Sequence, residues 1–221
     1  SNMVLYNVSI VNIINRFEKI GSTEVDLSNY VTKDTYDSLL SRVENLEYEP
    51  IKITSFTSKH SGYYEVGYVL SRVDLNWSTS KTPSKIIAAG REITNMNQTA
   101  LIISDANLSS SAYMTLQVTD ERGATDSKTV NFYFCYRLYW GTGSSLDITN
   151  LSYNELSGDV SRTITLTTGE NEYMYYAIPK VLGTAQFKVG GFDGGFDDPI
   201  EQTITNSYGL EVDYLIYKST N

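Results

Sequence analysis

The first fifty residues carry an apolar heptad pattern, which ends abruptly and is followed only by sequence typical of β-strands. Steps of three and four residues separate the apolar side chains Met3, Tyr6, Ile10, Ile13, Phe17 and Ile20. The same spacing resumes at Tyr36, Leu39, Val43 and Leu46. This is the a/d seam of a coiled coil, and isoleucine at both core positions favours trimers or tetramers over dimers. The pattern therefore predicts an oligomeric helical stalk over residues 1–49.

Two helices are expected in this stalk. The first runs over about residues 4–20 and ends at Gly21, because glycine commonly adopts the left-handed conformation that ends a helix. The second starts near Thr32, a suitable N-cap, has Asp34 in its first turn and runs to about Glu47. Helices this short are marginal in isolation, so self-association would stabilise them. The alternative is an intrachain helical hairpin folded against a β domain.

Residues 50–135 change to a period of two, which is typical of strands. Strands are expected at 51–56, 64–69, 73–77, 86–87, 93, 100–103, 114–118 and 130–134. Asp120 and Gly123 supply turn chemistry between the last two. About seven short strands, with a buried Trp77 on an early central strand, indicate an immunoglobulin-like β-sandwich. The paired cysteines of antibody domains are missing, because Cys135 is the only cysteine, and it is expected to be a buried thiol.

Residues 136–221 continue the β rhythm with different loops. Strands are expected at 138–140, 163–167, 173–178, 185–189, 202–206 and 212–217. The predicted fold is therefore mainly β: an N-terminal α-helical coiled-coil stalk (1–49) followed by two β-sandwich domains. These are the immunoglobulin-like domain (50–135) and a C-terminal tip domain (136–221).

The chain is acidic and rich in tyrosine. Its formal net charge of −9 argues against nucleic acid or an anionic membrane as a partner, since both attract clustered basic residues. Solubility alone is the alternative explanation of the acidity, and in general the more frequent one. No stretch approaches the roughly 20 apolar residues of a membrane span, so no membrane insertion is expected. The 18 tyrosines suit surfaces that bind sugars or proteins, and many of them are expected simply to build the sheets.

Most enzyme signatures are missing. His60 is the only histidine and lies in a polar run, so a Ser-His-Asp or Cys-His device would have to be built on it. One histidine and one cysteine cannot complete a zinc site, and there is no phosphate loop or dinucleotide fingerprint. No catalytic residue, no cofactor and no enzymatic activity are therefore expected. Two facing carboxylates for glycoside hydrolysis leave no linear trace and stay open as an alternative.

The strongest local candidate for a site is the loop at 190–199, which reads GGFDGGFDDP. Its many glycines imply positive φ or a close approach of the backbone. The candidate ligand contacts are Phe192, Asp193, Phe196, Asp197 and Asp198, together with Tyr175. The three aspartates could converge on calcium, but the loop has no established calcium motif, so the prediction is no metal and solvated acids. The two phenylalanines either form an exposed apolar contact or pack beneath the loop.

Several stretches of this sequence resemble tail-fibre and baseplate proteins of bacterial prophages. The stalk segments 29–36 (NYVTKDTY) and 39–47 (LLSRVENLE) are similar to the stalk of those proteins. The stretch 118–125 (VTDERGAT) resembles the last hairpin of their immunoglobulin-like module. The stretches 175–179 (YYAIP) and 189–196 (VGGFDGGF), with Gly183 between them, resemble their C-terminal domain.

The resemblance implies a trimeric, elongated virion protein of the phage tail, assembled in the bacterial cytoplasm. Its expected partners are further copies of itself, other tail and baseplate proteins, and a bacterial surface glycan or protein receptor bound by the C-terminal domain. It implies no catalytic residue. The alternatives are a phage-tip glycan depolymerase or esterase, and a bacterial surface adhesin built from sandwiches.

Overall fold

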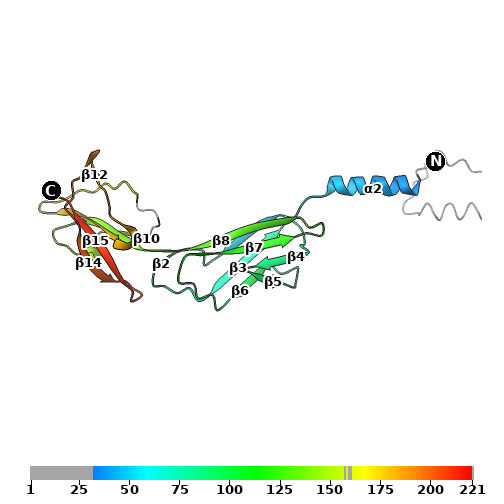
Figure 1. The fold of residues 1–221 in the computed structure, drawn as a ribbon, viewed down its shortest axis with the longest axis horizontal. Helices are drawn as coiled ribbons and strands as arrows, with labels where there is room; N and C mark the ends of the chain where they lie inside the picture. The colour runs from blue at the N-terminus through cyan, green and yellow to red at the C-terminus, as the bar shows by residue number, and fades with distance from the viewer. Residues whose placement is uncertain (1–31, 157, 159–160, 221) are drawn as a thin grey trace, which may run out of the picture. The chain divides into compact units, whose positions relative to one another are not determined.

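The computed structural model describes residues 32–156, 158 and 161–220 of the 221-residue chain. The chain divides into two units, Ser1–Pro50 and Ile51–Asn221. The described residues are mainly β, with α2 (Lys33–Glu47) as their one α-helix (Figure 1). The helix predicted over residues 4–20 lies outside them. Across the described ranges, every helix is too short or too polar to cross a lipid bilayer.

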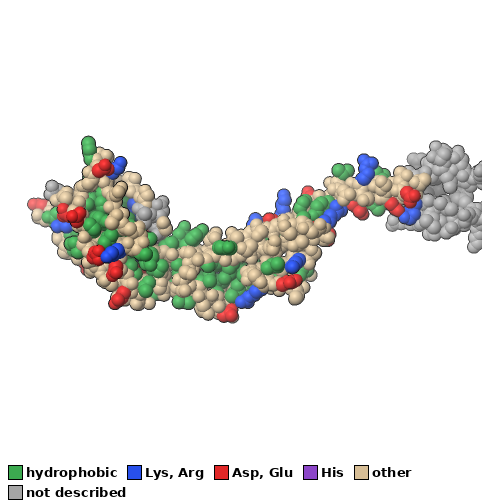
Figure 2. Space-filling model, in the orientation of Figure 1, with side chains coloured by type: hydrophobic (Ala, Val, Ile, Leu, Met, Phe, Trp, Pro, Cys, Tyr) green, Lys and Arg blue, Asp and Glu red, His purple; other side chains and the backbone are tan. Residues whose placement is uncertain are grey.

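The second predicted helix is confirmed. Helix α2 begins after Thr32, whose hydroxyl accepts a hydrogen bond from the Thr35 amide at 3.2 Å, and Asp34 lies in its first turn. None of its 15 residues is buried, and hydrophobic side chains lie at its surface among charged ones (Figure 2). A long coiled-coil stalk is not seen in the described part of the chain, which holds only this short helix.

Residues 51–135 form two sheets around one hydrophobic core. The first sheet has the order β1 (Ile53–Ser58), β3 (Val73–Thr79), β6 (Ala100–Ile103). The second has the order β2 (Gly62–Glu65), β8 (Thr125–Cys135), β7 (Ala112–Thr119), β4 (Lys85–Ala88), β5 (Arg91–Ile93), and β2 runs parallel to β8. Alternate residues of both sheets meet in one cluster, including Trp77, Leu116 and Phe132. The predicted burial of Trp77 is confirmed, since its exposed fraction is 5%.

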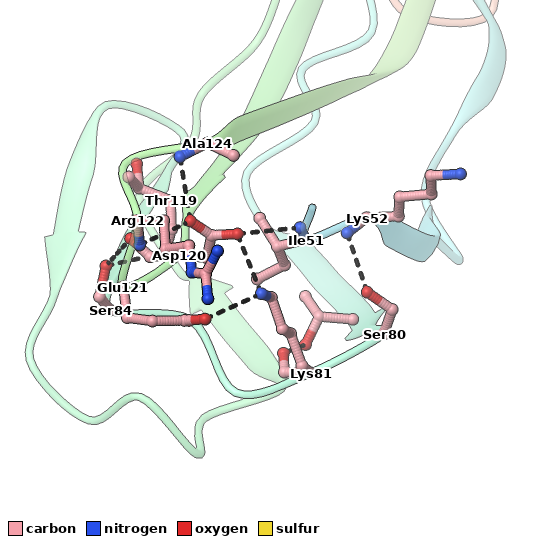
Figure 3. A network of polar contacts seen from close by, with 11 residues as sticks. Ile51, Lys52, Ser80, Lys81, Ser84, Thr119, Asp120, Glu121, Arg122 and Ala124 are labelled. Atoms are coloured by element: carbon pink, nitrogen blue, oxygen red, sulfur yellow. Dashed lines mark hydrogen bonds and ion pairs between the residues drawn. The ribbon is translucent and has the colours of Figure 1, made fainter. Parts of the chain in front are cut away.

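The turn between β7 and β8 is built on a buried carboxylate, Asp120. Gly123 adopts a φ of 83° there, a conformation that favours glycine, and its amide bonds the Asp120 carbonyl at 3.1 Å. One oxygen of the Asp120 side chain accepts hydrogen bonds from the backbone amides of Arg122 and Ala124, with N···O distances of 3.0 Å in both cases. Its other oxygen receives the Ile51 amide at 3.2 Å and the Lys81 ammonium at 3.0 Å (Figure 3). Asp120, which the sequence predicted as a turn residue, thus also holds Ile51, the first residue of the unit Ile51–Asn221.

The next two residues are held in the same manner. The Lys52 amide donates to the Ser80 hydroxyl at 2.9 Å, and the Ile53 amide donates to the Asp126 carboxylate at 2.7 Å. Three successive amides at the start of β1 are therefore bound by side chains from other strands and turns.

The carboxylates of Asp126 and Asp74 make the free energy of unfolding depend on pH. The Ile53 amide holds the pKa of Asp126 below its usual value, and the guanidinium of Arg72, with Lys59, does the same for Asp74. A lowered pKa in the folded state adds stability that is fully present above the unfolded value of about 4 and is lost as pH falls. We expect the free energy of unfolding to decrease from about pH 5 downward. Urea titrations over this pH range should show a shallower decrease in Asp126→Asn, and an equal slope would contradict the assignment.

Residues 137–218 contain a third sheet, which is five-stranded and antiparallel. Its order is β10 (Tyr153–Leu156), β9 (Arg137–Gly143), β11 (Tyr173–Pro179), β15 (Glu211–Lys218), β14 (Ile200–Thr205). A two-stranded ribbon of β12 (Lys188–Val189) and β13 (Phe192–Asp193) and two short 3-10 helices, Ile148–Asn150 and Lys180–Leu182, complete the described elements. Apolar side chains cover both faces of the sheet, Tyr175 and Ile216 on one face and Tyr176 and Tyr217 on the other.

This arrangement differs from the second β-sandwich expected for residues 136–221. The predicted strand at 163–167 alternates between half-buried and exposed residues, yet residues 163–168 make no backbone hydrogen bond to another described residue. Of the predicted strand at 185–189, only Lys188–Val189 pairs. The alternation arises because every second side chain, such as Ile164 and Phe187, packs against the sheet. It does not require the backbone to pair with another strand. The described residues therefore show segments that cover the sheet with side chains, where a second sheet was expected.

Candidate functional site

A groove of about 610 Å³ lies over one face of the five-stranded sheet. Residues 161–166 form one wall and residues 184–190 form the other. Strands β9 and β11 supply the floor with Trp140, Tyr176 and Ile178. Its size falls within the range of small-molecule sites, which are mostly apolar with a few placed polar groups.

The second wall is held in place by aromatic packing. Phe187 stacks on Phe196 with ring centroids 4.0 Å apart and meets Tyr176 and Tyr217 edge to face, with centroids 5.8 and 4.9 Å apart. The Tyr217 hydroxyl accepts a hydrogen bond from the Ala185 amide at 3.0 Å. These side-chain contacts thus fix the wall to the sheet, although few of its residues pair with a strand through backbone hydrogen bonds.

The first wall is held by Arg162. Its guanidinium lies 4.7 Å from the centre of the Trp140 ring, a cation–π contact, and pairs with the Glu155 carboxylate at 2.7 Å. Tyr153 also stacks on Trp140, with ring centroids 6.0 Å apart. The residues of the groove that carry polar side chains are Ser161, Arg162, Thr165, Thr184, Gln186 and Lys188. The groove therefore combines an aromatic floor with a rim of hydroxyl, amide and ammonium groups.

The three aromatic residues among the predicted site residues have three different environments in the structure. Of the two outcomes expected for the loop phenylalanines, packing applies to Phe196, which is half-buried, packs on Phe187 and lines the groove. Exposure applies to Phe192, which is 81% exposed. Tyr175 is 3% exposed and its side chain packs in the cluster on the opposite face of the sheet, yet the residue is also among those that line the groove.

The three loop aspartates are exposed and do not form one cluster. Asp193 lies 3.7 Å from the Lys188 ammonium, and the Asp197 amide bonds the Lys218 carbonyl at 2.9 Å. Asp198 is also exposed. Within the described ranges, no three acidic, histidine or cysteine side chains come close enough to hold a metal ion. The geometry of Asp193, Asp197 and Asp198 therefore offers no calcium cage.

Sequence reasoning missed most of the groove. Trp140, Gln186 and Phe187 were not predicted as site residues, because they come from segments interpreted as ordinary strands, and Arg162, which directly precedes such a segment, was not predicted either. When an arginine and a tryptophan, or two acids, come from distant parts of the chain, their contact produces no characteristic spacing in the sequence. Two of the predicted site residues do line the groove, Phe196 from the loop at 190–199 and Tyr175 from β11.

No family model, no curated protein and no solved structure matches this chain. The function proposed next therefore rests on the residues of the chain itself.

Proposed function

We propose that this chain is a non-enzymatic structural protein of a phage tail fibre or baseplate that binds a bacterial surface glycan through its C-terminal domain. The observation that carries the proposal is the groove on the C-terminal sheet, with its aromatic floor and polar rim. A saccharide is amphipathic in the same way: its C–H faces pack on rings, and its hydroxyls exchange hydrogen bonds with amide, hydroxyl and ammonium groups. The resemblance of the stalk, hairpin and C-terminal stretches to tail proteins supports the virion assignment.

The finer architecture belongs to the same proposal. Residues 50–135 would be an immunoglobulin-like β-sandwich, supported by the strand orders β1-β3-β6 and β2-β8-β7-β4-β5 around one core. The described sheet at 137–218 would be the ligand-binding tip. Association of three chains through the stalk would multiply weak contacts to a repetitive glycan by raising their effective concentration.

The composition of the groove favours binding over catalysis. The described residues that line it include no aspartate, glutamate, histidine or cysteine, and the nearby Glu155 is already paired with Arg162. A glycosidase requires two carboxylates that face the scissile bond. The depolymerase is therefore the weaker alternative, and it would require acids from elsewhere on the surface.

The double variant Thr184→Ala with Gln186→Ala tests the groove. We expect its apparent affinity on an array of bacterial surface glycans to fall roughly tenfold or more, since two hydrogen-bonding groups are removed from the rim. The matched control is Gln202→Ala with Thr205→Ala, which removes the same residue types from exposed positions of β14 outside the groove.

The loop acids form a second arm of this experiment. Replacing Asp193, Asp197 and Asp198 together by asparagine should leave glycan binding nearly unchanged. Loss of binding only in this triple variant would move the site from the groove to the loop. A wild-type chain that binds none of the glycans would contradict the proposed function.

A further inference from the structure

We infer that a pocket in the first β module, residues 51–135, binds a single neutral saccharide unit through Tyr113, Arg91 and Asp105. The pocket lies beside β7 where β4 ends and has a volume of about 430 Å³, within the range of small-molecule sites. None of its described lining residues belongs to the groove on the C-terminal sheet. The inference therefore adds a second site to the proposed function and does not depend on the groove.

The pocket exists because β4 is shorter than its neighbour β7. Strand β4 pairs with residues 116–119 of β7 and ends at Ala88. There Ala89 and Gly90 turn the chain back into β5, and both have a positive φ, 48° and 75°, as a type I′ hairpin turn requires. Strand β7 continues past this turn, and its residues 113–115 line the open space. The tight turn thus leaves the first part of β7 without a neighbouring strand on that side.

The backbone of β7 offers one donor and one acceptor to this space. Backbone groups along a strand point to alternate sides, and the Thr115 carbonyl points toward β4, since it accepts the Ala89 amide at 2.8 Å. Tyr113 lies two positions earlier, so its N–H and C=O point to the same side, past the end of β4. Among the described residues, neither group has a hydrogen-bond partner on that side. A ligand in the pocket can therefore bond both.

Two opposite charges face each other across the pocket. Arg91 is the first residue of β5, and Asp105 belongs to the loop after β6, which the Ala106 amide ties to the Ser71 carbonyl at 2.9 Å. The Arg91 Nη2 and Asp105 Oδ1 atoms lie 3.6 Å apart, which is longer than a hydrogen bond. The guanidinium therefore keeps its N–H donors, and the carboxylate keeps its acceptors, for a ligand.

These groups together match a neutral saccharide. The Tyr113 side chain is exposed at the pocket, where the C–H face of a sugar ring can pack on it, and Ile103 and Met114 supply further apolar surface. Vicinal hydroxyls can donate to the Asp105 carboxylate and accept from the Arg91 guanidinium. The two charges cancel, so a charged ligand gains no net attraction from them.

An extended peptide fits this space less well. Strand addition relies on a row of free backbone groups along a sheet edge. Strand β7 begins at Ala112, and the Thr115 carbonyl is already bonded to Ala89. In the described strand, only Tyr113 thus offers both of its backbone groups beside the pocket, which is too short a row for a stable added strand.

Methionine methyl groups can report on the pocket and the groove separately. Met114 lines the pocket, Met174 lines the groove, and Met96 lines neither. The full chain, labelled with ¹³C at its methionine methyl groups, is titrated with the methyl glycosides of glucose, galactose, mannose, rhamnose and N-acetylglucosamine. Each is raised to about 20 mM, at which a site with a dissociation constant of about 1 mM is nearly full. We expect the Met114 signal, assigned through Met114→Leu, to shift saturably with at least one glycoside while Met96 stays unchanged.

Two variants test the assigned contacts. Asp105→Asn and Tyr113→Leu should each raise the dissociation constant obtained from the Met114 shift by roughly tenfold. Glu201→Gln is the matched control for the acid, because Glu201 is also exposed and pairs with a basic residue, Lys180, at 2.7 Å. Tyr63→Leu is the control for the aromatic residue, since Tyr63 is 61% exposed on β2 and lines neither site.

Three outcomes would overturn the inference. The first is a Met114 signal that none of the glycosides shifts, and the second is a shift that Asp105→Asn and Tyr113→Leu leave as strong as in the wild type. The third is a shift produced by tetrathreonine and by none of the glycosides, which would assign the pocket to an extended peptide. The Met174 signal reports on the groove in the same titrations, so failure of the pocket and failure of the proposed function are seen separately.

Discussion

Replacing Asp120 by alanine is expected to lower the free energy of unfolding by about 3–5 kcal/mol, because it breaks a buried ion pair and leaves its partners unsatisfied. The carboxylate is fully buried and receives the amides of Ile51, Arg122 and Ala124 as well as the Lys81 ammonium. Since a small domain is stable by only about 5–15 kcal/mol, this variant should retain little of its folded population at elevated temperature.

Urea unfolding of the full chain measures the loss. The matched control is Asp105→Ala, because Asp105 also pairs with a basic residue, Arg91 at 3.6 Å, but at the surface. Exposed pairs contribute about 0–1 kcal/mol, so the control should unfold near the wild type. Equal losses in the two variants would show that the Asp120 network does not stabilise the turn.

The variant Trp77→Ala should lose about 3–5 kcal/mol, the usual effect of deleting a large buried aromatic side chain. Trp77 lies on β3, and its indole packs in the core between residues of both sheets. The cavity left behind cannot collapse easily, because the neighbouring strands are tied together by their ladders.

Tyr113→Ala is the control for Trp77, since Tyr113 is an aromatic residue of β7 that is 70% exposed. Its replacement should change stability by no more than about 0.5 kcal/mol. The measurement is the midpoint of thermal or urea unfolding. A Trp77→Ala variant that melts with the wild type would mean that the core is not built around this residue.

The elements that the sequence predicted correctly are those with local signals. The second helix was predictable because Thr32 provides its N-cap and its apolar residues follow a helical period. The hairpin of β7 and β8 was predictable because alternation and turn residues occur together. Trp77 was predictable as buried because it continues the alternation of Val73 and Leu75.

The failures share one physical cause, which is that pairing and contacts are decided at long range. Ile164 and Leu166 alternate like a strand, but whether a strand forms depends on a neighbour with free backbone groups. The contact of Arg162 with Trp140 joins segments distant in the sequence, and the bond of Asp120 to Ile51 spans 69 positions. Nothing in the local sequence of either pair indicates its partner, so the groove and the buried carboxylate emerge only from the fold.

The side-chain bonds at the start of β1 have a mechanical consequence. A pull on the chain from the N-terminal side of Ile51 acts first on the bonds to Asp120, Ser80 and Asp126, before it reaches the ladder of β1 with β3. Two of these acceptors are carboxylates, which form stronger hydrogen bonds than neutral groups. Asp120 directly follows β7, and Asp126 is the second residue of β8. Tension is therefore shared with the 11-residue strand β8, the longest strand among the described residues, and does not act on the short edge strand β1 alone.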